Sequence, residues 1–141
     1  MRAAATLDRI PWFGRGTLSA GSVVNRILAQ VSRYLDDPAI HDYAIAQVNQ
    51  HLTTETRVVI GHSLGSVVAY DTLRTRRWVN IAAPDDVVAA RRELHAVFDR
   101  DRPHDALFED TWNVDNGSKP HQINFYLTKQ SCGAAVADAL T

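Results

Sequence analysis

A serine between two glycines, followed later by adjacent aspartates and a histidine, gives this chain the residue types of a hydrolytic site. The segment Gly61-His62-Ser63-Leu64-Gly65 matches Gly-x-Ser-x-Gly, a pattern that presents a serine hydroxyl as a nucleophile. Alone it is a weak signal, because two glycines and a serine at fixed offsets often occur by chance. Its neighbours strengthen it, since the β-branched run 58–60 precedes it and an apolar pattern with helical spacing follows as far as Leu73. A strand, a sharp turn and a helix in this order are typical of a nucleophile elbow.

The residue types around Ser63 suit such an elbow, which we define as residues 61–65. The serine must adopt a strained backbone conformation, so small residues at Gly61 and Gly65 would keep neighbouring backbone from clashing. The helix that follows would direct its first N–H groups at a developing oxyanion, with the N–H of Leu64 as the first donor. The alternative interpretation is that Gly61 ends a strand and Ser63 merely caps a helix.

The base of this site would be a histidine that follows the serine. A serine hydroxyl is a poor nucleophile until a histidine accepts its proton and a carboxylate orients that histidine. On an elbow the chain order is serine, acid, histidine. His95 lies in a helical pattern and His104 in a charged loop, which favours surface positions for both. His121 follows the turn at 116–120 and is the better candidate, with an ordinary loop histidine as the alternative.

The acid has two candidates of nearly equal merit. Asp85 and Asp86 both follow an expected strand that ends at Ala83. One of them would cap the next helix and the other would face His121. The physics of the sequence alone does not choose between them.

The elements that would position these residues alternate between helix and strand. Apolar residues at helical spacing predict a helix over 22–36, and Asp37-Pro38 predicts its end and the start of another. The remaining expected elements are strands at 58–60, 78–83 and 111–114, and helices over 64–73, from Asp85 or Asp86 to Phe98, and from Thr128 to Leu140. This alternation predicts an α/β protein with a small parallel sheet flanked by helices.

The composition is typical of one soluble domain over residues 1–141. Apolar residues make up 45% and charged residues 22% of the 141 residues, and the net charge of −1 gives no reason to expect a nucleic-acid partner. The single cysteine, Cys132, excludes an internal disulfide and a cysteine-rich metal site. No stretch approaches the roughly 20 apolar residues that span a bilayer, and no signal peptide is recognisable. We therefore expect a cytoplasmic protein without an integral membrane segment, a metal or a cofactor.

The segment 61–73, GHSLGSVVAYDTL, closely resembles the elbow of lipase-like serine α/β-hydrolases. A wider pattern resembles a bacterial branch of that superfamily, whose members are often described only as hydrolases or serine peptidases of unknown substrate. The matching segments are 33–37, 56–63, 78–80, 86–89, 114–117, His121 and 126–127. The resemblance covers most of the chain from about Ser22 onward. It implies Ser63 as nucleophile, Asp86 as acid and His121 as base, and so favours Asp86 over Asp85.

The chain departs from that family at two places. The family has several strands before the elbow and an early His-Gly loop that supplies a second oxyanion donor, whereas residues 1–20 contain no histidine. Between Leu73 and Trp78 the family places a further strand and often lid residues, but only four residues stand here. We therefore expect a partial α/β-hydrolase fold, truncated at the N-terminus and after the elbow helix. The 58–60 strand would then be an exposed sheet edge, covered by the two N-terminal helices, a second copy or a partner chain, or left open in a marginal remnant.

Two functions follow from these features. The first is a serine hydrolase that cleaves an ester, thioester or amide of a small-molecule or lipid-like acyl substrate through an acyl-enzyme. Trp12 and Phe13 could line its acyl site, although packing against the next helix is the commoner fate of such a pair. The second is a catalytically impaired, truncated relative that acts as a binding module or survives as a remnant. Phosphate binding at the elbow is a weak third idea, because no lysine follows Gly65 as a P-loop requires.

Overall fold

The computed structural model describes residues 18–73, 77–89, 94, 107–111 and 113–141 of the chain. These residues fall into two compact units, the first ending at His51 and the second running from Leu52 to Thr141. The organisation into a single domain over 1–141 stays a prediction.

The first unit contains two helices that meet at Asp37. Helix α2 spans Leu18–Asp36 and helix α3 spans Pro38–Asn49. Asp37 caps α3, because its Oδ1 accepts hydrogen bonds from the N–H of Ala39 at 2.9 Å and of Ile40 at 3.4 Å. Proline at the first helical position needs no backbone partner there. The break predicted at Asp37-Pro38 is thus confirmed.

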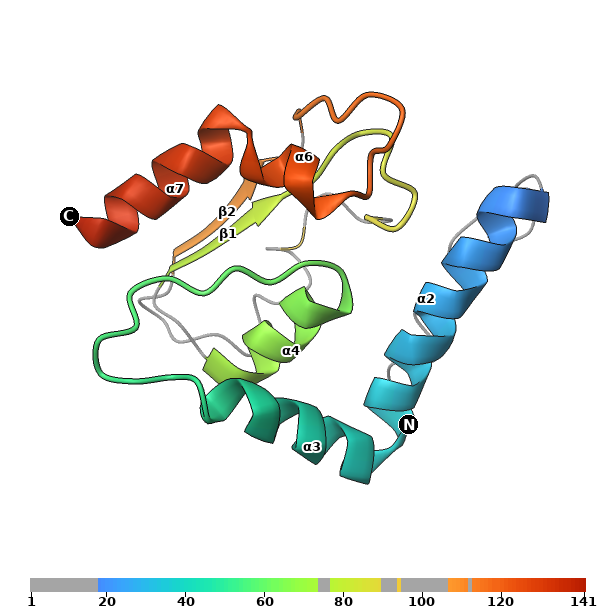
Figure 1. Cartoon of the computed structure of the whole chain (residues 1–141), viewed down its shortest axis with the longest axis horizontal. Helices are drawn as coiled ribbons and strands as arrows, with labels where there is room; N and C mark the ends of the chain where they lie inside the picture. Colours follow the sequence, from blue (N-terminus) through green and yellow to red (C-terminus); the bar gives the residue numbers. More distant parts are fainter. Residues whose placement is uncertain (1–17, 74–76, 90–93, 95–106, 112) are drawn as a thin grey trace. The chain divides into compact units, whose positions relative to one another are not determined.

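The second unit is built on two parallel strands. Strand β1 spans Arg77–Ile81 and strand β2 spans Leu107–Thr111, paired in register from Arg77 with Leu107 to Ile81 with Thr111. Around them lie helices α4 (Leu64–Leu73), α6 (Ile123–Leu127) and α7 (Gln130–Leu140), as Figure 1 shows. Within the described residues the protein is therefore mixed α/β, with five helices and a small parallel sheet.

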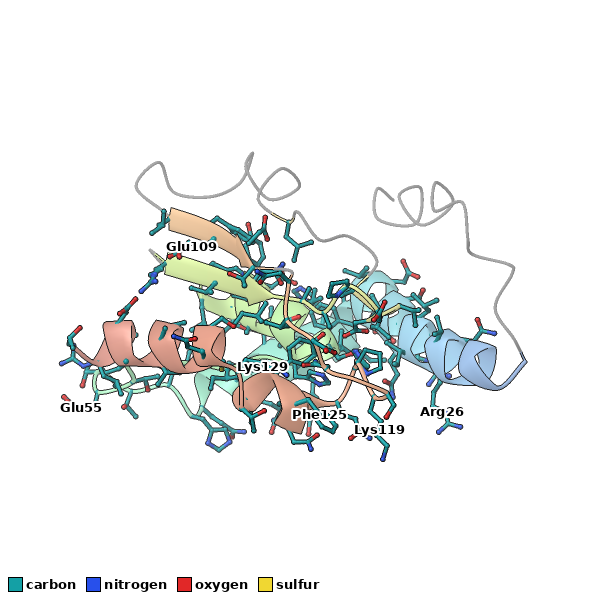
Figure 2. The ribbon with its side chains drawn as sticks, turned by 90° about the horizontal axis from the view of Figure 1, so that it is seen from above. Arg26, Glu55, Glu109, Lys119, Phe125 and Lys129 are labelled. Atoms are coloured by element: carbon teal, nitrogen blue, oxygen red, sulfur yellow. The ribbon has the colours of Figure 1, made fainter. Side chains whose placement is uncertain are left out.

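Strand β1 is held by contacts to both neighbouring helices and to β2. The ring of Trp78 meets the edge of Tyr70 on α4, with centroids 5.4 Å apart. Arg77 donates from Nε to Glu109 on β2 at 2.7 Å, and from Nη2 to Asp138 on α7 at 3.3 Å. Figure 2 labels Glu109 on its strand. These ion pairs join three elements at the amino end of β1.

Most of the buried apolar residues of the second unit directly follow β1 or belong to α4. Ala82 and Ala83 follow that strand, and both are almost fully buried, as are Val68 and Ala69 of α4 and Val114. The buried polar residues Asp86 and Asn116 belong to the neighbouring loops. The buried apolar residues therefore lie in segments that adjoin the candidate site residues in the chain.

The prediction of a strand at 58–60 is wrong. This segment has irregular structure, and the side chains of Val59 and Ile60 are 39% and 53% exposed. β-branched residues favour a strand only where a neighbouring strand pairs with it, and no described strand pairs with this run.

The strand predicted at 111–114 begins four residues earlier, at Leu107, and ends at Thr111. Its centre holds Glu109 and Asp110, which are poor strand formers by themselves. Opposite charges and amides across the sheet compensate for them, since Arg77 binds Glu109 and the Asn80 amide donates to Asp110 at 3.0 Å.

Two helix predictions also need correction. Thr128 does not cap the last helix; it ends α6, where its hydroxyl donates to the Phe125 carbonyl at 2.9 Å, and Lys129 precedes α7. The helix predicted from Asp85 or Asp86 to Phe98 is absent from its described part, where residues 84–89 form turns. Residues 90–93 and 95–98 lie outside the described residues.

Among the described helices, none is both long and apolar enough to cross a membrane.

Replacement of the cap residue, Asp37→Ala, should lower the free energy of unfolding by about 1 kcal/mol, because two N–H groups of α3 lose their acceptor. Urea unfolding followed by circular dichroism measures this loss. Asp42→Ala is the matched control, since Asp42 is exposed and bonds to its neighbour His41; its effect should stay within about 0.5 kcal/mol. Equal losses in the two variants would contradict the capping role.

Candidate active site

Ser63 occupies a strained turn immediately before α4. Its φ is 55°, and among the described residues it is the one non-glycine residue with a positive φ. A side chain at such a φ costs energy, and residues held there often serve function. The turn is closed by three hydrogen bonds: from the Gly65 N–H to the His62 carbonyl at 2.9 Å, and from the Ser66 N–H and hydroxyl to the Ser63 carbonyl at 3.0 and 2.6 Å.

The two glycines of the elbow differ in whether the surrounding backbone leaves room for a side chain. A Cβ on Gly61 would lie 2.7 Å from the Ser66 Cα and 2.8 Å from the Gly65 carbonyl oxygen, both backbone atoms. A Cβ on Gly65 would meet nothing within 4 Å. The steric requirement predicted for both positions therefore holds for Gly61 and not for Gly65.

Leu64 is the first residue of α4, so its N–H has no acceptor within the helix. The next two N–H groups are already used inside the elbow. Within the described part of the chain the Leu64 N–H bonds to no other group, which leaves it available to an oxyanion. It is the donor that the motif predicts.

Asp86, and not Asp85, is the carboxylate that meets His121. Asp86 is 5% exposed, whereas Asp85 is exposed to solvent. The His121 Nδ1 lies 3.1 Å from Asp86 Oδ1 and 3.0 Å from Oδ2. The Val88 N–H also donates to Oδ1, at 3.0 Å. A buried carboxylate needs such donors.

The hydrogen bond to Asp86 determines where His121 carries its proton. A carboxylate only accepts, so in the neutral ring the proton must be on Nδ1. Nε2 then keeps a free lone pair. The side chain is 29% exposed, and within the described residues no group bonds to this nitrogen. This tautomer is the one that a general base of a serine site uses.

The loop that carries His121 is fixed by local hydrogen bonds. Gly117 has a φ of 60°, and its N–H donates to Asp115 Oδ1 at 2.7 Å, which confirms the predicted turn. The amide of the buried Asn116 donates to the Pro120 carbonyl at 2.9 Å and closes the loop. These bonds place His121 at the end of a tight turn.

His62 joins this loop to the elbow. Its Nε2–H donates to the backbone carbonyl of His121 at 2.8 Å, and the two imidazole rings lie 4.7 Å apart between centroids. Because His62 directly precedes Ser63, the elbow and the loop of His121 are in contact.

The structure brings Asp86 and His121 together but does not bond His121 to Ser63. Within the described residues, the Ser63 hydroxyl forms no hydrogen bond, and His121 Nε2 forms none either. Hydrogen bonds between nucleophile and base are often loose without substrate and tighten when it binds. The contact through His62 shows that these two residues belong to the same region of the second unit.

Tyr126 is a member of this cluster to which the sequence assigned no role, although 126–127 is one of the segments that resemble the hydrolase branch. Its hydroxyl donates to Asp86 Oδ2 at 2.7 Å and accepts from the Ala83 N–H at 3.0 Å. Burial, and then the hydrogen bond to Asp86, raise the pKa of Tyr126. The available signal was a tyrosine in the otherwise mostly apolar segment 123–127, which does not point to an aspartate forty residues earlier.

Some predicted residues lie outside the described part of the chain. These are Trp12 and Phe13, the expected acyl-site residues, and the rejected histidines His95 and His104. Among the described residues, no group of three or more side chains could hold a metal ion.

Gly61→Ala should lower the free energy of unfolding by about 1–3 kcal/mol, because backbone atoms of residues 65 and 66 would have to move. Gly65→Ala is the matched control, and it should be neutral or stabilising by up to about 1 kcal/mol. Urea unfolding compares the two. A Gly65→Ala variant as unstable as Gly61→Ala would contradict the geometry described for the elbow.

His62→Phe should loosen the 115–122 loop, because the ring contact remains while the donor to the His121 carbonyl is lost. We expect amide exchange in this loop to become about 5-fold faster, which corresponds to about 1 kcal/mol. His62→Gln keeps an N–H donor and should exchange like the wild type. Equal exchange in His62→Phe and wild type would show that this hydrogen bond does not hold the loop.

No family model matches the chain, and no curated protein or solved structure is significantly similar to it. The resemblance to lipase-like α/β-hydrolases therefore stays a prediction that rests on the sequence motifs.

Proposed function

We propose that the second unit carries a serine hydrolase site that cleaves an ester, thioester or amide through an acyl-enzyme. Ser63 is the nucleophile, His121 the base and Asp86 the acid. The observation that carries the proposal is the buried Asp86 carboxylate bonded to Nδ1 of His121, on a loop that touches a strained serine turn.

The residues support a complete proton route. Ser63 Oγ attacks the acyl carbon and its proton passes to Nε2 of His121. The imidazolium that forms is stabilised by Asp86, and the negative oxygen of the tetrahedral intermediate accepts from the Leu64 N–H. When the intermediate collapses, the leaving group takes the proton from Nε2. Water then repeats these steps on the acyl-enzyme and releases the acid.

Exposed apolar side chains support an apolar, lipid-like acyl group in the substrate. Ile60 lies three residues before Ser63, Val87 directly follows Asp86, and Ile123 lies two residues after His121. Their exposed fractions are 53%, 50% and 41%. Each of the three reactive residues thus has an apolar side chain close to it in the chain.

We extend this proposal to the cellular location and to the protein partners. The one cysteine, Cys132, is a free thiol, which suits the reducing cytoplasm. A second copy or a partner chain at residues 58–60 is supported by the exposure of Val59.

One observation favours the alternative function, a catalytically impaired binding module. The Ser63 hydroxyl makes no hydrogen bond to His121 within the described residues. If that separation persists with substrate bound, the serine is not activated and the cluster can only bind.

A fluorophosphonate probe distinguishes the two functions, because it reacts with a serine only when a base activates it. We expect labelling of the folded wild type and none of Ser63→Ala. Ser118→Ala is the matched control, since Ser118 is an exposed serine of the His121 loop, and it should label like the wild type. A folded wild type that does not label, or labelling retained in Ser63→Ala, would reject the hydrolase function.

A further inference from the structure

We propose that Tyr126 is a positioning residue of the site, whose hydroxyl fixes the Asp86 carboxylate so that His121 keeps its proton on Nδ1. The inference rests on the proposed function, because this proton position matters only if His121 accepts a proton from Ser63. It adds a tyrosine to the residues on which the base depends.

The direction of the hydrogen bond from Tyr126 to Asp86 is fixed by the chemistry of Ala83 and Asp86. The Ala83 N–H can only donate, and it donates to the Tyr126 oxygen at 3.0 Å. The Asp86 carboxylate can only accept, so the phenolic proton must lie between Tyr126 and Oδ2, at an O···O distance of 2.7 Å. A hydroxyl that already accepts a hydrogen bond is a stronger donor in a second hydrogen bond. Hydrogen bonds to a charged carboxylate are also stronger than those between neutral groups.

The carboxylate is held through both of its oxygens. Oδ1 accepts from the Val88 N–H, and Oδ2 accepts from Tyr126. His121 Nδ1 lies almost equally far from the two oxygens, at 3.1 and 3.0 Å. The terminal torsion of an aspartate is soft, so with the Tyr126 donor removed the carboxylate, held then only by the Val88 N–H on Oδ1, can turn about that torsion. His121 would then lose the fixed acceptor that selects its tautomer.

Tyr126 remains a donor throughout the neutral range. Burial is the largest cause that raises its pKa, and the hydrogen bond to Asp86 is the next. Because the folded chain holds this proton more tightly than the unfolded chain, the stabilisation is complete below the ordinary tyrosine pKa of about 10. It is lost only as the pH rises above that value.

Helix α6 explains how a residue so close to His121 in the chain reaches the acid. Figure 2 labels Phe125 on this helix and Lys119 on the preceding loop, both at the surface of the unit. The next residue, Tyr126, lies about 100° further around the helix and bonds to Asp86. One short segment, 119–127, therefore carries both the base and the hydroxyl that fixes the acid.

Tyr126→Phe tests the proposal, because it removes one oxygen atom and keeps the ring. Long-range ¹⁵N–¹H spectra of the histidines, assigned with His121→Gln, report the tautomer of His121 without any need for activity. We expect the wild type to hold the Nδ1–H tautomer and Tyr126→Phe to populate the Nε2–H tautomer. Fluorophosphonate labelling of Ser63 should slow about 10-fold. Tyr43→Phe, which removes an exposed hydroxyl from the first unit, is the matched control and should change neither result.

A second variant keeps the hydroxyl and its hydrogen bonds, so we expect it to fold like the wild type. With 3-fluorotyrosine at position 126 the donor is stronger, because fluorine makes the phenol more acidic. The Nδ1–H tautomer should persist, and its proton resonance should move upfield as Tyr126 draws charge from Asp86. A His121 tautomer unchanged in Tyr126→Phe, or a resonance unmoved by 3-fluorotyrosine, would overturn the positioning role. A wild type that is not labelled would instead reject the proposed function, and the tautomer result would still decide the role of Tyr126.

Discussion

The burial of one carboxylate determines how the second unit is joined together. A side chain as polar as Asp86 can be 5% exposed only if donors replace the water that it has lost. One donor, the Val88 N–H, comes from its own turn. The others come from His121 and Tyr126, which lie 35 and 40 residues further along the chain. Satisfying Asp86 therefore requires the end of β1 and the C-terminal segments to fold against each other.

The two ends of β1 are fixed by different kinds of interaction. At the amino end, Arg77 binds Glu109 and Asp138 while remaining partly exposed, and the bond to Glu109 is the largest cause that raises the pKa of Arg77. Exposed ion pairs of this kind contribute little stability, so their main effect is to set the register of the elements. At the carboxyl end, Ala82 and Ala83 are buried. The small side chain of Ala83 lets the tyrosine of α6 reach its backbone N–H. The buried end of β1 is thus the end that carries the candidate site.

Local signals in the sequence were sufficient for most helices and turns. The spacing of apolar residues predicted α2 and α4, Asp37-Pro38 predicted the start of α3, and Asn116-Gly117 predicted the turn before His121. All of these depend on residues a few positions apart. The choice of Asp86 over Asp85 came from the resemblance alone, and the structure agrees with it in geometry.

Strands and the site network could not be predicted in the same way, because they depend on distant partners. The run 58–60 has the residues of a strand, but no strand of the described residues pairs with it. Leu107–Thr111 has two acidic residues and forms a strand because β1 supplies Arg77 and Asn80. Tyr126 has no periodicity or spacing that would connect it to Asp86. A sequence shows which side chains can donate and accept, but the pairs are decided by the packing.

The two supports of His121 leave free the two atoms that the proposed hydrolysis requires. The ring is oriented through Nδ1 by Asp86, and the backbone is held through its carbonyl by His62, the residue next to the nucleophile. A histidine at position 62 is therefore part of the site, because it ties the base to the elbow without using Nε2. Within the described residues, His121 Nε2 and Ser63 Oγ are left without hydrogen bonds while the groups that orient them are bonded. In the proposed reaction a proton passes between these two atoms, so the binding of an acyl group at the elbow has only to bring them together.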